Sequence, residues 1–392
     1  MKTLELKPGK DKAVRRFHPW IFSGAIRNLE NERVEDGELV RVNDHKGRFL
    51  AIGHFHNGSI AVRILTFDEE EINAGFWQKR IQDAFAYRRM LGLPAPGKTT
   101  CYRLLHAEGD RLPGLVVDVY NHVAVVQCHS IGMHRSVGEI ADAILERAEG
   151  DIVAVYDKSS ETLPANYAAS LENGYIRGDA EPEPVLENGI QFKVDWVTGQ
   201  KTGFFLDQRI NRELLGKFCE GKKVLNCFSY SGGFSLYALK GGAKLVHSVD
   251  ASARAIEQCN ENVALNFPDS EKHESFVEDV LKYLRECDEY EVMVVDPPAF
   301  AKSFAKRHNA VQGYKRLNAA AFRKVAPGGI MFTFSCSQVV DRELFYNTVV
   351  AAALDAGRQV RVLQHLSQPP DHPVNLFHPE GAYLKGLALQ VL

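Results

Sequence analysis

The stretch Lys223-Val224-Leu225-Asn226-Cys227-Phe228-Ser229-Tyr230-Ser231-Gly232-Gly233-Phe234-Ser235-Leu236 decides the fold of this chain. It starts as a short apolar strand, continues through small residues that include the adjacent Gly232 and Gly233, and ends as the first turn of a helix. Glycine has no Cβ, so it permits a sharp reversal from strand to helix and a close approach by a ligand. The helix N-terminus leaves backbone N–H groups free to bind that ligand. We therefore expect a nucleotide-binding turn here.

A second strand follows at 244–249 and ends in Asp250. In doubly wound nucleotide folds, an acidic residue about 20 residues after the glycine turn holds the ribose hydroxyls. The turn lacks the G-x-G-x-x-G pattern of dinucleotide sites, which favours a single nucleoside such as S-adenosylmethionine. The plain alternative is an ordinary strand–helix turn followed by a solvated aspartate.

Beyond Glu213 the chain alternates between strand-like and helix-like segments. This alternation predicts an α/β fold with a Rossmann-like, doubly wound and mostly parallel sheet that has helices on both faces. We expect a last strand at 382–391 to pair at the edge of the sheet. The expected strands are 224–226, 245–249, 275–277, 291–295, 330–334 and 359–365, and the expected helices are 234–240, 252–265, 279–286, 314–325 and 341–356.

Two smaller modules precede this sheet, so we expect three domains at 1–68, 69–180 and 181–392. The first is β-rich, with short alternating runs between turn signals. The second is α+β, with a helical segment at 69–91, a hairpin around Asn121 and a helix at 137–148. A proline-rich linker at 181–184 precedes the third.

A basic segment with interleaved aromatic residues lies in the first module, at 10–20. Cationic side chains suit contacts with phosphates, and the neighbouring Phe17 and Trp20 suit stacking on bases. A solvated charge run with both rings in the local core explains the pattern equally well. The candidates for phosphate contact are Lys10, Lys12, Arg15 and Arg16.

The composition is that of a globular protein, with 45% hydrophobic and 25% charged residues. The formal net charge of -3 excludes a strongly basic protein overall, although a local basic face remains compatible with it. The seven cysteines form no C-x-x-C pair, so we expect neither a zinc site nor a disulfide framework. No apolar run is long enough to cross a bilayer, and a reducing cytoplasm is the simplest location.

Ligand sites in such sheets lie beyond the carboxyl ends of the strands, and two further strand ends carry distinctive residues. Glu278-Asp279 follows one strand, where a carboxylate can accept a hydrogen bond from an adenine amino group. Asp296-Pro297-Pro298-Ala299-Phe300 follows another. Two prolines remove backbone donors and fix φ, which suits a shelf for a flat base that carries an exocyclic amine. Phe300 is the expected stacking ring.

One more strand end gives Phe334-Ser335-Cys336-Ser337. A thiol just past a central strand is well placed to act as a nucleophile on an electron-poor ring carbon. A buried structural cysteine is the alternative and the usual fate of this residue type.

These residues resemble a known family, the bacterial 23S rRNA 5-methylcytosine methyltransferases of the large-subunit type I group. The resemblance runs from end to end. The segment 18–26 resembles the opening of that family's N-terminal PUA domain, and 103–115 resembles its middle EEHEE-type domain. The segments 203–209 and 226–235 resemble its methyltransferase motifs and are the more specific matches. The resemblance therefore implies a PUA-like domain, an EEHEE-type domain and a class I methyltransferase domain.

The resemblance also implies S-adenosylmethionine as the methyl donor, with Asp250 on its ribose, Asp279 near its adenine and Asp296 beside both cofactor and cytosine. RNA, either 23S rRNA or a large-subunit precursor, is the implied partner, and a homodimer is one open assembly. The remaining implied cofactor residues are Asp207, Gln208, Arg209, Asn226, Phe228, Ser229, Tyr230, Gly232 and Gly233. The implied substrate residues of the shelf are Pro297, Pro298 and Phe300.

In the implied mechanism, Cys336 attacks C6 of a flipped or single-stranded cytosine, and C5 takes the methyl group. Loss of the C5 proton and expulsion of the thiolate restore the ring, while Asp296 holds the N3/N4 edge. Many related RNA enzymes carry a second cysteine at the position of Ala299. Its absence agrees with a one-cysteine subgroup and leaves the acceptor of the C5 proton unidentified.

Three alternatives stay open. An RNA N-methyltransferase would use Asp-Pro-Pro and an aromatic ring on an exocyclic amine, with Cys336 incidental. A non-catalytic RNA-binding or ribosome assembly protein would keep the fold without methyl transfer. A nicotinamide oxidoreductase is disfavoured because G-x-G-x-x-G is absent.

Overall fold

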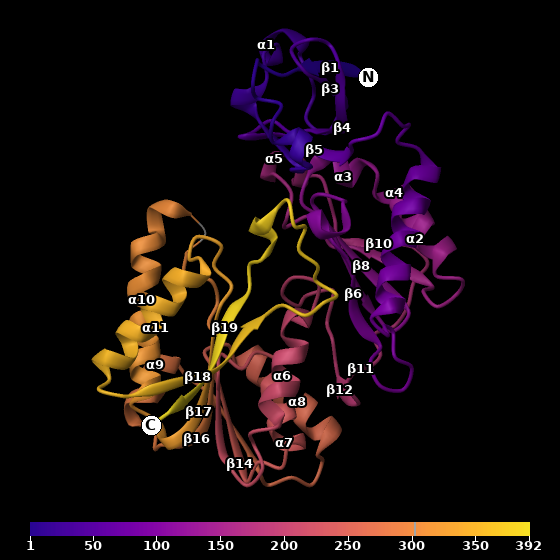
Figure 1. Cartoon of the computed structure of the whole chain (residues 1–392). Helices are drawn as coiled ribbons and strands as arrows, with labels where there is room; N and C mark the ends of the chain where they lie inside the picture. The colour runs from indigo at the N-terminus through magenta and orange to yellow at the C-terminus, as the bar shows by residue number, and fades with distance from the viewer. Residues whose placement is uncertain (302) are drawn as a thin grey trace. The chain divides into compact units, whose positions relative to one another are not determined.

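The computed structural model describes residues 1–301 and 303–392, which form two compact units (Figure 1). Unit 1 consists of Met1–Val185, Val194–Leu206 and Pro370–Gly381. Unit 2 consists of Leu186–Lys193, Asp207–Pro369 and Ala382–Leu392. The boundary expected near residue 68 falls inside unit 1, so the division into three domains stays a prediction.

Unit 1 begins with a five-stranded sheet in the order β1-β3-β4-β5-β2. Alternating apolar side chains such as Leu4, Val40 and Val62 are buried and form its core. The short helix α1 (Leu29–Glu32) lies in one of its connections. The strands are β1 (Lys2–Glu5), β2 (Trp20–Phe22), β3 (Leu39–Asn43), β4 (Phe49–Phe55) and β5 (Ile60–Thr66).

A second five-stranded sheet of unit 1 has the order β10-β9-β8-β7-β6. Its strands are β6 (Cys101–His106), β7 (Leu115–Tyr120), β8 (Val123–Cys128), β9 (Ala154–Asp157) and β10 (Gly174–Arg177). The expected hairpin is present, and Asn121 takes a left-handed φ of 51° in its turn. Its helices are α2 (Ala74–Met90), α3 (Ile131–Arg135), α4 (Val137–Arg147) and α5 (Ala165–Ala168).

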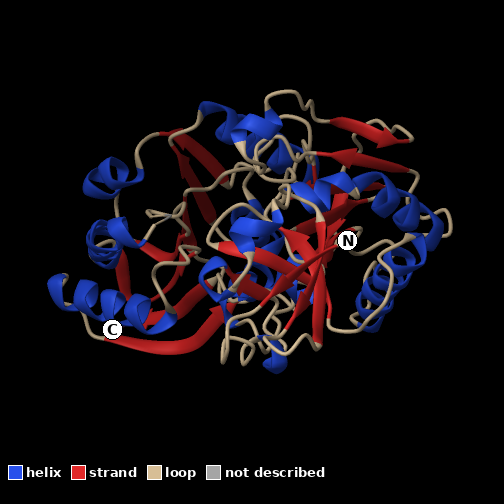
Figure 2. Ribbon diagram, turned by 90° about the horizontal axis from the view of Figure 1, so that it is seen from above, coloured by secondary structure: helices blue, strands red, loops and turns tan. Residues whose placement is uncertain are grey.

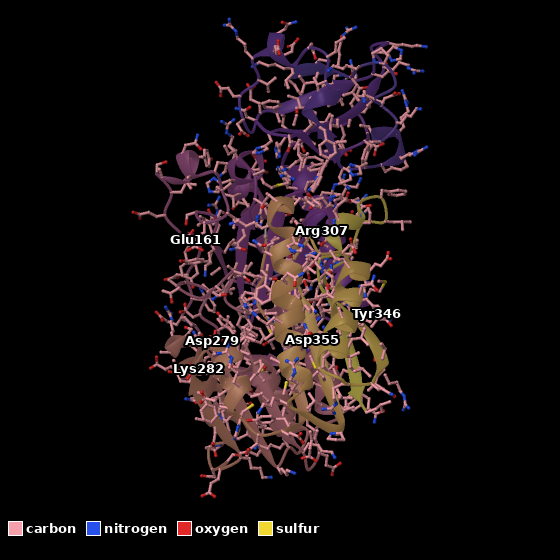
Figure 3. The ribbon with its side chains drawn as sticks, turned by 90° about the vertical axis from the view of Figure 1, so that its left-hand side faces the viewer. Glu161, Asp279, Lys282, Arg307, Tyr346 and Asp355 are labelled. Carbon is pink, nitrogen blue, oxygen red and sulfur yellow. The ribbon has the colours of Figure 1, made fainter. Side chains whose placement is uncertain are left out.

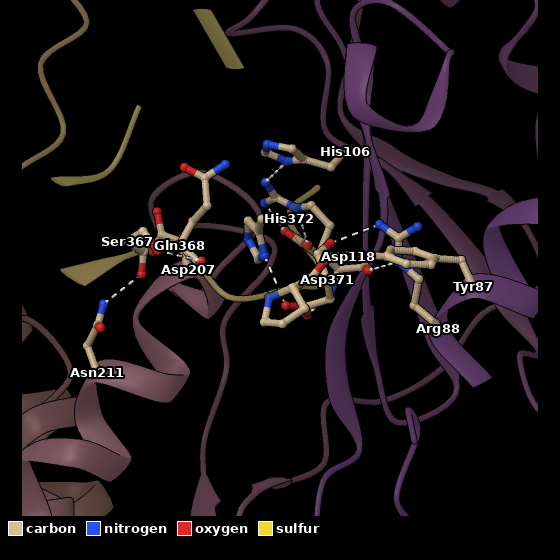
Figure 4. Close-up of polar contacts among 12 residues, drawn as sticks. Tyr87, Arg88, His106, Asp118, Asp207, Asn211, Ser367, Gln368, Asp371 and His372 are labelled. Carbon is tan, nitrogen blue, oxygen red and sulfur yellow. Dashed lines mark hydrogen bonds and ion pairs between the residues drawn. The ribbon is translucent and has the colours of Figure 1, made fainter. Parts of the chain in front are cut away.

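The segment Pro370–Gly381 belongs to unit 1 although both of its flanks belong to unit 2. The buried guanidinium of Arg88 donates to the backbone oxygen of Asp371 over 2.8 Å, and the Asp371 carboxylate accepts from the backbone N–H of Arg103 over 3.1 Å (Figure 4). The phenol of Tyr87 donates to the backbone oxygen of Pro370 over 2.8 Å. These hydrogen bonds attach the segment to α2 and β6.

Unit 2 is built on a seven-stranded sheet in the order β15-β14-β13-β16-β17-β19-β18. The neighbours from β15 to β17 pair in parallel, which confirms the α/β fold with a mostly parallel sheet. The strands are β13 (Lys223–Cys227), β14 (Leu245–Asp250), β15 (His273–Val277), β16 (Tyr290–Val295), β17 (Val325–Ser335), β18 (Val360–Ser367) and β19 (Lys385–Val391).

The last strand was expected at the edge, and that expectation is wrong. β19 lies between β17 and β18 and is antiparallel to both. The physical reason is burial, because six of the seven residues of β19 are buried, whereas those of β18 are mostly exposed or half-buried. A strand that is apolar on both faces is stable only where sheet neighbours and helices cover it.

Helices cover both faces of this sheet (Figures 1 and 2). One face carries α6 (Arg209–Gly216), α7 (Gly233–Lys240) and α8 (Ala253–Asn266), and the other carries α9 (Val280–Glu286), α10 (Arg307–Phe322) and α11 (Arg342–Asp355). Helix α10 begins at Arg307 rather than at the expected residue 314. Its first turn is largely exposed and polar, so it lacks the apolar periodicity by which a sequence reveals a helix.

No helix among the described residues is long and apolar enough to cross a membrane.

A buried ion pair joins α6 to the small hairpin of β11 (Val185–Glu187) and β12 (Ile190–Phe192). Arg212 Nε lies 2.8 Å from Glu187 Oε1, and Arg212 Nη2 lies 2.7 Å from Glu187 Oε2. Burial opposes the positive charge, but Glu187 outweighs this effect and raises the pKa of Arg212. The Tyr237 hydroxyl of α7 also donates to Glu187 Oε1 over 3.1 Å. The pair therefore ties three elements of unit 2 together.

We expect Arg212→Met to lower the free energy of unfolding of unit 2 by about 3–5 kcal/mol, because it leaves the Glu187 carboxylate buried without its partner. Urea denaturation of the full chain measures this loss. The double variant Arg212→Met, Glu187→Leu removes both charges and is expected to recover most of it. A double variant no more stable than the single one would contradict this account.

Candidate active site at the carboxyl ends of the parallel strands

The turn between β13 and α7 requires its glycine. Gly232 precedes α7 with a φ of 82°, and a Cβ there would lie 2.6 Å from Cys259 Sγ of α8. Phe228 and Tyr230 also take left-handed conformations, with φ of 59° and 45°. Left-handed backbone is costly for residues other than glycine, so the turn is a tightly constrained feature of the sheet edge.

Asp250 holds this turn against the end of β14. Its Oδ2 accepts from the backbone N–H of Tyr230 over 3.0 Å, and its Oδ1 accepts from that of Ser252 over 2.9 Å. The parallel register pairs Cys227 with Val249, so both strands end at the same edge. The structure therefore brings together the glycine turn and the predicted ribose-binding carboxylate.

Three buried polar atoms near this turn have no hydrogen-bond partner within the described chain: Asn226 Oδ1, Ser229 Oγ and Ser231 Oγ. The other side-chain polar atom of Asn226, Nδ2, donates to Ser235 Oγ over 2.8 Å. Buried polar groups in native proteins are normally satisfied, so unpaired ones indicate a place for a polar ligand or water. These residues fit the polar groups of a bound nucleoside cofactor.

The segment 207–209 lies across this edge. Gln208 Nε2 donates to Asp296 Oδ2 over 3.0 Å, and Asn211 Nδ2 donates to Gln208 Oε1 over 2.6 Å. The Asn211 amide also donates to the backbone oxygen of Ser367 over 3.2 Å (Figure 4). The Tyr383 hydroxyl donates to Asp207 Oδ2 over 2.7 Å, and Arg209 is buried. These side chains link the start of α6 to the end of β16.

The proline shelf follows β16. Asp296 is half-buried, Pro297 is buried and Pro298 is exposed. The Phe300 ring packs on Tyr314 of α10, with 4.6 Å between the ring centroids and an interplanar angle of 41°. Phe300 is therefore held by α10, and a base that stacked on it would have to use the part of the ring that Tyr314 leaves uncovered.

Cys336 comes directly after β17, the parallel neighbour of β16. The next residue, Ser337, donates from Oγ to the backbone oxygen of Ala301 over 2.7 Å, so the loops that carry Cys336 and Asp296 are fastened to each other. All seven cysteines are described, and five are buried. The sixth, Cys287, is half-buried but follows α9 and precedes β16, at the amino ends of the strands. Cys336 is thus the partly exposed thiol at the carboxyl edge.

Asp279 has a local structural role as well. It caps α9, where its Oδ1 accepts from the backbone N–H of Lys282 over 2.9 Å, and it is exposed at the surface (Figure 3). Its neighbour Glu278 pairs with Lys282 Nζ over 2.7 Å. The capping bond uses Oδ1 of the carboxylate, and the contact of Asp279 with adenine stays a prediction.

The four basic candidates of the first module are all exposed in unit 1. Arg15 is held by carboxylates, with Nε 2.6 Å from Asp11 Oδ2 and Nη2 2.8 Å from Asp44 Oδ2. Arg15 therefore offers less free charge to a phosphate than Lys10, Lys12 or Arg16. Phe17 is 51% exposed, so it lies outside the local core.

Sequence reasoning missed two residues that the structure adds to this site. Tyr314 is buried between Phe300 and the end of β17, and burial raises the pKa of its phenol to about 12. Lys385, the first residue of β19, lies opposite Ser335. Neither carries a motif, because each reaches the site through strand order and helix packing.

Among residues 1–301 and 303–392, no group of three or more histidine, cysteine or acidic side chains is placed to hold a metal ion.

Family models match two parts of the chain. An S-adenosylmethionine-dependent methyltransferase model matches residues 166–387, and a PUA-like domain model matches residues 4–67. A protein described as a SAM-dependent methyltransferase from Streptococcus mutans has the same fold, with a TM-score of 0.85 at 24% identity over 100% of both chains. A second solved structure, described as a methyltransferase complexed with SAH, has a TM-score of 0.86 at 24% identity and covers 100% of both chains. Fold, site and models define an S-adenosylmethionine-dependent methyltransferase with a PUA-like domain.

Curated relatives narrow the class. Ribosomal RNA large subunit methyltransferase I from Aeromonas salmonicida (strain A449) is 42% identical over 98% of this chain and 98% of its own length. The protein of the same name from Shewanella denitrificans is 41% identical over 99% of both. The chain belongs to the ribosomal RNA large subunit methyltransferase I family.

We expect Gly232→Ala to weaken S-adenosylmethionine binding at least tenfold, because the new Cβ would meet Cys259 Sγ in a left-handed backbone. Isothermal calorimetry on the full chain measures the affinity. Gly221→Ala is the matched control, since Gly221 also has a positive φ, 66°, but a Cβ there would meet nothing within 4 Å. Equal affinities for the two variants would contradict the assignment of the cofactor to this turn.

Proposed function

We propose that this methyltransferase forms 5-methylcytosine in 23S rRNA or its large-subunit precursor through a covalent bond between Cys336 and C6 of the base. The family supports ribosomal RNA as the substrate, because the relatives carry that substrate in their names. One observation carries the choice of chemistry: Cys336 is a partly exposed thiol at the carboxyl edge of the sheet, in a loop that is hydrogen-bonded to the loop of Asp296. A cytoplasmic location suits both the substrate and a reactive thiol.

The cofactor is assigned to the residues around the glycine turn. Asp250 would hold the ribose, because it ends the first strand after the glycine turn. Asp279 would hold the adenine, because it follows the next strand along the chain. Bound S-adenosylmethionine supplies an electrophilic methyl group. The other assigned residues are Asp207, Gln208, Arg209, Asn226, Phe228, Ser229, Tyr230, Gly232, Gly233 and Asp296.

In the proposed reaction, the Cys336 thiolate adds to C6 of cytosine, and the electron pair of the C5–C6 double bond moves to C5. The carbon at C5 then becomes nucleophilic enough to take the methyl group, which would leave the sulfonium with its bonding electron pair on sulfur, so that S-adenosylhomocysteine is the leaving group. Asp296 binds the N3/N4 edge, and Gln208 orients Asp296 through its hydrogen bond. Loss of the C5 proton and expulsion of the thiolate regenerate the aromatic ring. Pro297, Pro298 and the accessible part of Phe300 form the shelf beside the base.

We expect Cys336→Ala to abolish formation of 5-methylcytidine while S-adenosylmethionine affinity stays within about threefold, because the thiol adds to substrate only. The measurement is methyl transfer from labelled S-adenosylmethionine to rRNA from cells that lack this protein, with the nucleoside identified by mass spectrometry. Cys287→Ser is the control for loss of a half-buried thiol. An N-methylated product that persists in Cys336→Ala would instead establish an exocyclic-amine methyltransferase.

The PUA-like domain is proposed to contact the phosphates of the RNA through Lys10, Lys12, Arg15 and Arg16. Three features support this role. All four side chains are exposed, exposed aromatic rings lie close by, and among the residues that the structure describes only Arg15 of the four is paired with carboxylates. Phe17 and Phe22 are each 51% exposed, and such rings stack on unpaired bases.

Replacing these four residues with glutamine is expected to weaken RNA binding and to reduce the slope of log K against log salt by about 3 units, since each phosphate contact with a single strand contributes about 0.7 to the slope. Fluorescence anisotropy with an rRNA fragment at several salt concentrations measures both. The matched control replaces four exposed lysines of unit 2, Lys217, Lys222, Lys244 and Lys272, with glutamine. Equal slopes for the two variants would refute the assignment.

A further inference from the structure

A buried lysine lies beside the proposed nucleophile. Lys385 begins β19 and is 4% exposed. The antiparallel register pairs it with Ser335, the residue immediately before Cys336. Burial of an ammonium group is costly, and proteins retain one where paired groups compensate for the lost hydration. The groups that face Lys385 therefore indicate what it does.

The Lys385 ammonium holds the chain on the far side of Cys336. Its Nζ donates to the backbone oxygens of Ser337 and Val340, each over 2.6 Å. An ammonium group has three donors, so these two carbonyls leave one N–H for another group. Lys385 thus contacts the chain on both sides of Cys336. It pairs with Ser335 before the thiol and binds the backbone oxygens of Ser337 and Val340 after it.

Within the described part of the chain, Lys385 forms no ion pair with a carboxylate. The ionisable groups whose charge affects the pKa of Lys385 are, from the largest effect to the smallest, Cys336, Arg342 and Asp341. Asp341 is engaged elsewhere: it caps α11 through Leu344 and lies 3.1 Å from Arg307 Nη2. Burial lowers the pKa of Lys385 to about 8, and Cys336 is the strongest of the charges that oppose this shift. Cys336 and Asp341 are thus the two negatively ionising groups that act on Lys385, and the loop of Cys336 is the one that the Lys385 side chain also binds.

A buried tyrosine also lies near Cys336. Tyr314 of α10 interacts electrostatically with both Cys336 and Asp296. The raised pKa of Tyr314 keeps its phenol neutral near pH 7, so it neither attracts nor repels the thiolate as an ion. Asp296 is a carboxylate and disfavours a second negative charge near it. A nearby cation offsets such repulsion.

We propose that Lys385 is a positioning residue for Cys336, whose thiolate it stabilises while it fixes the backbone that follows. The inference rests on the proposed role of Cys336 as nucleophile. An opposite charge close to a thiol favours the ionised form, which is the form that attacks carbon. The same ammonium also remains close when the thiolate is expelled at the end of the reaction.

Two substitutions separate charge from hydrogen bonding. Lys385→Gln keeps N–H donors for the carbonyls of Ser337 and Val340 and loses the charge. Lys385→Arg keeps both. The test uses the full chain with Cys287→Ser, which removes the other half-buried thiol. The pH dependence of Cys336 alkylation by iodoacetamide, followed by peptide mass spectrometry, reports the thiolate directly.

We expect the alkylation midpoint to rise by about one pH unit or more in Lys385→Gln and to stay within about half a unit in Lys385→Arg. The pH profile of kcat for rRNA methylation is expected to shift in the same direction, because more alkaline solution is then needed to form the thiolate. If Lys385 acted only as a structural anchor, Lys385→Gln would lower the stability of the protein and leave both pH midpoints unchanged. Unchanged midpoints in a Lys385→Gln protein that binds S-adenosylmethionine normally would overturn the inference.

A reciprocal measurement avoids substitution of the lysine. Carbon-13 NMR of labelled lysine should show the Lys385 ammonium titrating at a lower pH in Cys336→Ser than in the otherwise unchanged chain, because the thiolate is lost. An unchanged titration would overturn the inference even if no Lys385 variant folds. Alkylation and NMR both report ionisation without turnover. Failure of the proposed function would appear in a separate measurement, as 5-methylcytidine formed by Cys336→Ala.

Discussion

The bidentate ion pair between Arg212 and Glu187 is the interaction on which the ligand edge of unit 2 depends. It joins α6, the β11–β12 hairpin and α7 in a dry environment where neither charge can be lost alone. The aliphatic part of Arg212 lies directly under the glycine turn, since a Cβ on Gly233 would be 3.1 Å from Arg212 Cδ. A buried charge pair therefore lies under the glycine turn, and a Cβ on Gly233 would require the Arg212 side chain to shift by a few tenths of an ångström.

Parallel pairing of the strands brings the other candidate residues of the site to one edge of the sheet. Strands β14, β13, β16 and β17 run in the same direction, so residues scattered over more than a hundred positions of sequence end at one edge. Side-chain hydrogen bonds then lock the loops to one another, as Asp250 does for the glycine turn and Ser337 does for the proline shelf. The thiol and the carboxylate proposed for catalysis lie at the same edge because their strands, β17 and β16, are parallel neighbours.

The antiparallel strand β19 completes the site from the opposite direction. Its insertion between β17 and β18 brings the first residue of the strand, Lys385, to the end of β17, where Cys336 begins the next loop. The buried ammonium group proposed to stabilise the Cys336 thiolate therefore reaches that loop only because of the strand order. The last strand of the chain thus contributes chemistry as well as sheet closure.

The sequence by itself determined the α/β class, the hairpin at Asn121 and the glycine turn, because period-2 and period-3.6 patterns and the special backbone of glycine are local properties. It also pointed to Cys336 and Asp296, since strand ends can be recognised from short apolar runs. Only the tertiary structure decided the place of β19 between β17 and β18, the packing of Phe300 on Tyr314, the ion pair of Arg212 with Glu187, and the position of Lys385. Each of these depends on contacts between segments far apart in the chain, and no local pattern records which buried partner a residue will meet.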